Sequence, residues 1–119
     1  MKPVINYSDF EKLDIRVGRV ISASAPEWSN KLLRMEVDMG EEIGKRTLFS
    51  GIRKWYKPEE VVGKNMEFVI NMDPKKMGDP SSGSEQGGYS EGMLIMVDTE
   101  EQPILLFLPE AIKPGSVIR

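Results

Sequence analysis

Cysteine and histidine are both absent from the 119 residues. The absence of cysteine excludes disulfides, thiol nucleophiles and thiolate metal sites. The absence of histidine excludes the Ser-His and Cys-His pairs of many hydrolases and leaves no zinc centre built from the usual ligands. The 19 acidic residues contain no recognisable pair for general acid–base chemistry. We therefore expect a protein that is not an enzyme and that uses no metal or cofactor.

Long apolar segments are absent as well. No run of 18 apolar residues occurs, so the sequence predicts no membrane-spanning helix. The segment from Met1 to Tyr7 lacks the apolar core of a signal peptide, and the lack of cysteine is compatible with a reducing compartment. The length suits one domain. We therefore expect a free-standing, cytoplasmic single domain over residues 1–119.

Basic residues are absent from one long part of the chain. Between Met77 and Glu110 there are seven acids and no lysine or arginine, so the other residues hold 16 basic and 12 acidic groups despite a net charge of -3. Residues 45–57 contain five basic residues and no acid. Because charges more than about 10 Å apart are largely screened at 0.1 M salt, the sequence predicts a weak, localised basic patch.

Most segments have the pattern of β-strands. Residues 32–39 alternate apolar and polar side chains, as in a half-buried antiparallel strand. Gly18 interrupts one strand, as a bulge or a barrel bend often requires. The other predicted strands are residues 15–21, 46–50, 65–71 and 93–97.

The connections between these strands have their own signals. A short helix is predicted at Pro58–Val62, because proline and two glutamates suit a first helical turn and Gly63 can end it. We expect a turn at 40–44, and a hairpin loop at 98–102 that leads into an apolar segment and the C-terminal tail. The Gly/Ser-rich segment 78–88 is predicted to be a mobile loop.

Five strands with a helix between the third and the fourth predict an all-β OB-fold, a small five-stranded barrel with N- and C-terminal extensions. An SH3-like barrel or another small β-sandwich is the alternative. OB-folds bind oligonucleotides on strands two and three, between the loops that join strands one to two and four to five. Here those two rim loops are residues 24–31 and 72–90.

Seven fragments on these strands and loops resemble, in the correct order, the tRNA-binding domain of free-standing tRNA-binding proteins. The same domain is appended to methionyl-tRNA synthetases, phenylalanyl-tRNA synthetase β chains and the endothelial-monocyte-activating polypeptide. The resemblance covers about residues 13–97, with further likeness in 113–119. The fragments are Leu13–Val20, Asn30–Leu32, Val37–Gly40, Ser50–Ile52, Tyr56–Lys64, Asn71–Met77 and Ser90–Leu94.

The chain departs from the family pattern in two places. The family usually shows Asn-x-Lys-Pro-x-Lys near the fourth strand, whereas Asp73 here replaces the first lysine. The Gly/Ser-rich segment before Ser90 is an insertion where most relatives run directly from one motif to the next. An acidic residue in place of a basic one near the expected RNA surface should lower the affinity for RNA.

The resemblance implies that lysines contact phosphates, that the Ser90 hydroxyl contacts RNA and that Met93 offers an apolar platform to a base. From the residues alone, the segment 53–57 combines basic and aromatic side chains, which suits stacking on unpaired nucleobases. Trp28 is expected to be an exposed aromatic. Each has a plainer interpretation: solvated lysines, a core methionine, and aromatics packed beneath the helix. The predicted tRNA-binding residues are Asn30, Lys31, Ser50, Arg53, Lys54, Asn71, Lys75, Lys76, Ser90 and Met93.

The resemblance implies a non-catalytic protein that assists aminoacylation or tRNA handling, alone or with a methionyl-tRNA synthetase. One bacterial branch of the family looks like an export chaperone, so a peptide-binding role is an alternative; a subunit that docks to a synthetase is another. The segment 4–10 and the tail at 117–118 either pack on their own domain or form a two-fold interface. We expect a homodimer, as in similar free-standing family members.

Overall fold

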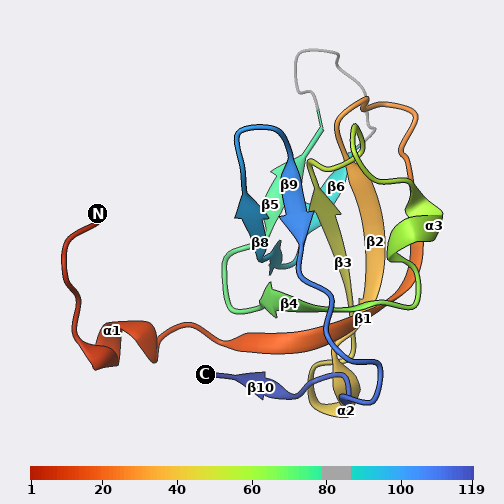
Figure 1. Cartoon of the computed structure of the whole chain (residues 1–119). Coiled ribbons are helices and arrows are strands. Elements are labelled where there is room, and N and C mark those ends of the chain that lie inside the picture. The colour runs from red at the N-terminus through yellow and green to blue at the C-terminus, as the bar shows by residue number, and fades with distance from the viewer. Residues whose placement is uncertain (79–86) are drawn as a thin grey trace.

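The computed structural model describes residues 1–78 and 87–119 (Figure 1). It contains three one-turn helices, α1 (Tyr7–Phe10), α2 (Gly40–Ile43) and α3 (Pro58–Val61). None of the described helices is long and apolar enough to cross a membrane. The strands are β1 (Ile15–Ser24), β2 (Leu33–Asp38), β3 (Lys45–Ser50), β4 (Asn65–Val69), β5 (Lys75–Met77), β6 (Gly88–Ser90), β7 (Met93–Leu94), β8 (Met96–Asp98), β9 (Pro103–Leu105) and β10 (Val117–Ile118).

The main sheet is an antiparallel, nearly closed barrel with the strand order β3-β2-β1-β4-β7. The strand β10 extends it by pairing with β1, and β5–β6 and β8–β9 form two separate ribbons. The helix α3 lies between β3 and β4 in the chain, as predicted. The structure therefore confirms the all-β, five-stranded OB-fold.

The strand β1 is central, because it pairs with β2, β4 and β10. Gly18 lies in its regular part, opposite Met66. A Cβ at Gly18 would lie 2.5 Å from Val37 and 2.8 Å from Met39 and from Phe68, so this glycine is needed for close packing. Of the two expected roles of Gly18, a bulge or a barrel bend, the bulge is not found there, because the register of β1 against β2 shifts between residues 20 and 22.

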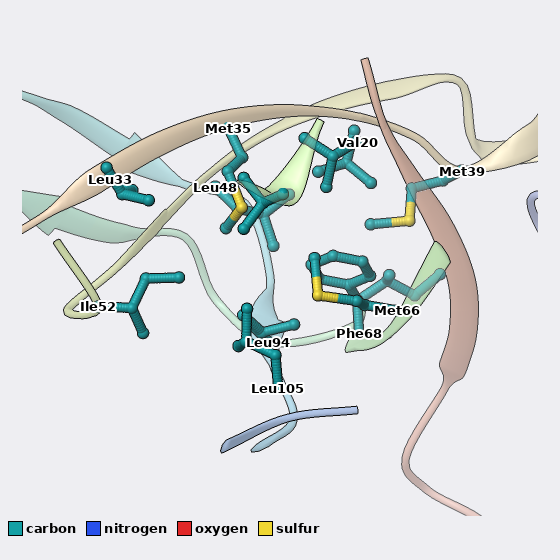
Figure 2. Packing of buried hydrophobic residues seen from close by; sticks show 13 residues of the cluster. Val20, Leu33, Met35, Met39, Leu48, Ile52, Met66, Phe68, Leu94 and Leu105 are labelled. Atoms are coloured by element: carbon teal, nitrogen blue, oxygen red, sulfur yellow. The ribbon is translucent and has the colours of Figure 1, made fainter. Parts of the chain in front are cut away.

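The core fills the barrel between these strands. The alternation of residues 33–39 places its odd-numbered side chains inside, where all four are fully buried. Figure 2 shows how side chains from β1, β2, β3 and β4 meet there. The buried cluster consists of Val20, Leu33, Met35, Val37, Met39, Leu48, Ile52, Val61, Met66, Phe68, Ile70, Leu94 and Leu105.

The predicted strand 93–97 is divided in the structure. Its first two residues form β7 on β4, whereas Met96–Asp98 form β8 and pair with β9. The reason lies on the edge of β4, where Ile95 N–H donates to Glu67 O and Leu108 N–H donates to Asn65 O. Leu108 therefore occupies the pairing position that a longer fifth strand would need.

Two expected connections also differ. The predicted turn at 40–44 contains the helical turn α2, which the two glutamates in its first turn stabilise. Part of the predicted rim loop 72–90 is the ribbon β5–β6, in which Lys75 pairs with Ser90. The predicted mobile loop 78–88 lies mostly outside the described residues.

The C-terminal segment is attached to the barrel by a polar clamp. The Arg19 guanidinium donates to Asn65 Oδ1 at 3.0 Å and to the carbonyl oxygens of Glu110 at 2.7 Å and Ile112 at 3.3 Å. The buried Asn65 amide donates to the carbonyl oxygens of Pro109 and Ile112, both at 3.0 Å. Because these contacts join β1 and β4 to residues 109–112, the tail is part of the fold.

A buried carboxyl lies next to this clamp on β4. Glu67 is 9% exposed, stands opposite Val17 in the ladder, and its Oε2 has no hydrogen-bond partner among the described residues. Burial raises the pKa of the Glu67 carboxyl above its ordinary value of 4.5, because the charged form loses its hydration. The carboxylate therefore opposes folding once it is ionised.

The change Glu67→Gln tests this cost. The folded state binds the Glu67 proton more tightly than the unfolded state does. The stability that the protonated carboxyl gives the wild type is therefore fully present below about pH 4.5 and is lost as the pH rises through the folded pKa. We expect the free energy of unfolding of Glu67→Gln, relative to the wild type, to increase between about pH 4 and about pH 8 in urea denaturation. The exposed Glu101→Gln is the control; an equal pH dependence in both variants would contradict the prediction.

Candidate nucleic-acid interface

Three hollows at one end of the barrel join into one surface, which we call the rim groove. Their volumes are about 600, 530 and 210 Å³. The first two share Asn30 and Lys31, the first and third share Lys75 and Met77, and the second and third share Gly51. The lining residues come from segments 27–32, 49–51, 54–55, 72–78 and 90–96.

The rim groove carries more positive than negative charge. Its described lining includes four exposed lysines and two exposed acids. This agrees with the weak, localised basic patch expected from the sequence, and the acid Asp73 lies in the same hollow as Lys75. The four lysines are Lys31, Lys54, Lys75 and Lys76.

Ser90 fastens the β5–β6 ribbon to β3. Its hydroxyl accepts a hydrogen bond from Phe49 N–H at 3.0 Å and donates to Gly92 O at 3.1 Å. Both Ser90 and the neighbouring groove residue Ser50 are buried. Ser90 therefore holds the ribbon in position. Its hydroxyl already takes part in two hydrogen bonds within the protein, so the predicted contact with RNA would compete with them.

Arg53 has a similar role at the first rim loop. Its guanidinium donates to the carbonyl oxygens of Pro26, at 3.0 Å, and Ser29, and its backbone N–H donates to Lys31 O at 3.1 Å. These bonds fix the first rim loop to the segment that follows β3. Arg53 thus shapes one wall of the rim groove with the same groups that would otherwise contact phosphate.

The aromatic residues near the groove divide into two kinds. Trp28 is half-buried and packs on Phe49 with ring centroids 5.7 Å apart, so the expectation of an exposed aromatic at this position is wrong. Tyr56 packs against the core, and its hydroxyl donates to Pro103 O at 2.9 Å. Trp55, in contrast, lines the groove and is exposed.

Asn71 does not line the rim groove. Its Oδ1 accepts from Asp14 N–H at 2.8 Å, and its amide donates to Lys12 O at 2.6 Å. It lines a different hollow of about 360 Å³ beside α1 and β10. The structure therefore does not place Asn71 among the lysines of the rim groove. Its side chain instead holds the backbone just before β1.

The structure also exposes a residue that the sequence reasoning missed. Tyr89 is 58% exposed and stands directly opposite Lys76 in the β5–β6 ribbon. Met93, the predicted platform, is exposed and lines the groove. The available signal for Tyr89 was an aromatic residue that follows two glycines and directly precedes the family fragment Ser90–Leu94.

The model of the family described as "Putative tRNA binding domain" matches residues 15–117. The chain belongs to this family. The match runs from the start of β1 to the first residue of β10, so it includes the barrel, the rim groove and the clamped C-terminal segment.

Proteins similar to this tRNA-binding domain include methionine–tRNA ligases and a chaperone. A methionine–tRNA ligase of Methanosarcina mazei is 42% identical over 98% of the chain, which spans only 15% of that ligase's length. A MetRS-related protein from Pyrococcus horikoshii is 33% identical, with 99% of this chain and all of that chain covered and a TM-score of 0.85. The chaperone CsaA from Bacillus anthracis is 28% identical, with 98% and 100% covered and a TM-score of 0.81.

The change Ser90→Ala tests the positioning role of this hydroxyl in the tRNA-binding domain. Loss of the acceptor leaves the buried Phe49 N–H without a partner, so we expect the free energy of unfolding to fall by about 1–3 kcal/mol in urea denaturation. The exposed Ser22→Ala is the control, and Ser90→Thr, which keeps the hydroxyl, should recover part of the loss. Equal stabilities of the Ser90→Ala and Ser22→Ala variants would contradict this role.

Proposed function

We propose that this chain binds tRNA in the rim groove and catalyses no reaction itself. The observation that carries the proposal is the gathering of four exposed lysines around apolar and aromatic surfaces, on the barrel end that OB-folds use for oligonucleotides. Membership of the tRNA-binding domain family supports the same conclusion. Among the described residues, no cluster of acidic side chains suits a metal ion.

The chemistry of the groove suits an RNA with unpaired bases. Lysines neutralise phosphates without reading sequence, while exposed aromatic and methionine side chains offer surfaces on which splayed bases stack. Lys76 and Tyr89 offer both kinds of contact on one ribbon. A folded tRNA would then be recognised by its shape, its backbone and a few exposed bases.

The biological setting that we propose is protein synthesis in the cytoplasm. The similarity to part of methionine–tRNA ligases supports a role in aminoacylation or tRNA handling, alone or together with a methionyl-tRNA synthetase. In this role residues 1–119 act as one binding domain. Docking to a synthetase with only weak RNA contact is the alternative for the same surface, and co-purification with the synthetase would reveal it.

Peptide binding is the second candidate function, and one feature of the groove favours it. Met72, Met77, Met93 and Met96 line the smallest of the three hollows, and methionine-rich surfaces adapt to many apolar partners. The similarity to the chaperone CsaA points the same way. Competition between tRNA and an unfolded polypeptide for the protein separates the two functions.

We propose further that two copies form a homodimer through their N-terminal segments and tails. The segment before α1 extends away from the barrel (Figure 1), and Val4 and Ile5 are 86% and 62% exposed. Tyr7 and Val117 are exposed beside it, at the hollow lined by α1 and β10. Burial of this apolar surface against a second copy would remove it from water and double the number of rim grooves.

The double change Lys75→Ala and Lys76→Ala tests tRNA binding in the groove. Loss of two phosphate contacts should weaken binding of total tRNA about tenfold and reduce the salt dependence of the affinity, a log–log slope, by about 1 to 2. Fluorescence anisotropy of labelled tRNA at several salt concentrations measures both. The matched control is Lys45→Ala with Lys113→Ala, two exposed lysines outside the groove lining. Equal losses in the two pairs, or no tRNA binding by the wild type, would overturn the proposal.

The dimer has its own test. Sedimentation equilibrium should give the wild type a mass about twice the 13.4 kDa of one chain. The double change Ile5→Asp and Val117→Asp should give a monomer, because it buries charges in an apolar interface. Val62→Asp, at an exposed valine after α3, should leave the dimer intact. A monomeric wild type would refute this interface.

A further inference from the structure

We infer that Trp55 and Lys54 form a separate base-binding position at one end of the rim groove, which takes an unpaired nucleobase of RNA and the phosphate beside it. This inference rests on the proposed RNA binding and goes beyond the lysine contacts described above. The segment 53–57 contains three basic and two aromatic side chains, and the structure divides them. Arg53 is bonded to carbonyls of the first rim loop and Tyr56 to a carbonyl of β9, whereas Lys54 and Trp55 line the groove.

Trp55 is held on a firm backbone. Its N–H and that of Tyr56 both donate to Ile52 O at 3.0 Å, and the Ile52 side chain is fully buried. The hydroxyl of Tyr56 is bonded to Pro103 O at 2.9 Å. Trp55 therefore projects from a turn that is fixed on both sides, which lowers the entropic cost of stacking a base on its ring.

The hollow at Trp55 has the chemistry of a base and its phosphate. It has a volume of about 530 Å³, and its described lining contains Asn30, Gly51 and two lysines but no acid. The other two hollows each contain one acid. The Lys54 ammonium lies over the Trp55 ring, 5.5 Å from its centroid. A base on this ring would thus meet an indole surface, an amide that can bond to its edge, and positive charge for the phosphate.

The Trp55 side chain is not needed to fill the core. Trp55 is 37% exposed, whereas Ile52 and Tyr56 on the same turn supply the contacts with the core. The hollow shares Asn30 and Lys31 with the lysine-rich part of the groove, so one RNA strand could contact both. Flanking lysines and the absence of a lining acid favour an RNA over a peptide at this position.

The test compares Trp55→Ala, Trp55→Leu and Trp55→Phe. Binding of total tRNA and of hexauridylate is measured by anisotropy at about 0.1 M salt, where screening is moderate. We expect Trp55→Ala and Trp55→Leu to weaken binding about 5- to 30-fold and Trp55→Phe to remain within about threefold of the wild type. Val62→Ala, an exposed apolar control outside the groove, should bind like the wild type. Circular dichroism establishes that each variant is folded, and the leucine variant replaces the alanine one if the latter unfolds.

A direct signal comes from the protein labelled with 5-fluorotryptophan, which has two fluorine resonances because the chain has two tryptophans. The resonance lost in Trp55→Phe should shift when hexauridylate is added. Wild-type binding of tRNA with no loss in Trp55→Leu would overturn this inference and leave tRNA binding in place. Binding of hexauridylate alone, with loss in Trp55→Leu, would support the base position and refute the tRNA function. Weaker binding of an unfolded polypeptide, but not of RNA, in that variant would assign the position to peptides and overturn the inference.

Discussion

At Gly18 the backbone of β1 approaches the core so closely that a methyl group would lie 2.5–2.8 Å from Val37, Met39 and Phe68. The rest of the barrel depends on this approach, because β1 pairs with β2, β4 and β10. A larger residue would separate β1 from the side chains of both neighbouring strands. The ends of these strands carry the rim loops, so the shape of the groove follows from a residue outside it.

Polar side chains at the groove serve two different purposes. Arg53 and Ser90 form hydrogen bonds with the backbone of neighbouring segments and so fix the walls. The lysines and Trp55 extend from these walls toward solvent. A binding surface arranged in this way loses little conformational freedom when a ligand arrives, because the backbone beneath it is already ordered. Shape and charge are thus supplied by separate residues.

The sequence alone predicted the parts of this structure that have local signals. Alternation identified the strand at 33–38, and proline with two glutamates identified α3. Lys31, Lys75 and Lys76, which the family resemblance suggested, line the rim groove. The roles of other residues depend on partners far along the chain, which no local pattern reveals: Ser90 bonds to Phe49, 41 positions away, and Asn71 to Asp14, 57 positions away. The division of strand 93–97 likewise results from Leu108.

The contacts between the first strand and the tail have a consequence for how the protein is made. Arg16 donates to the carbonyl oxygen of Gly115, 99 positions later, and β10 pairs with the start of β1. The central strand therefore acquires its last neighbour only after residues up to about 118 have left the ribosome. Contacts of such long range slow folding, commonly into the range of about milliseconds to seconds, and the unpaired strand edge is open to aggregation during that delay.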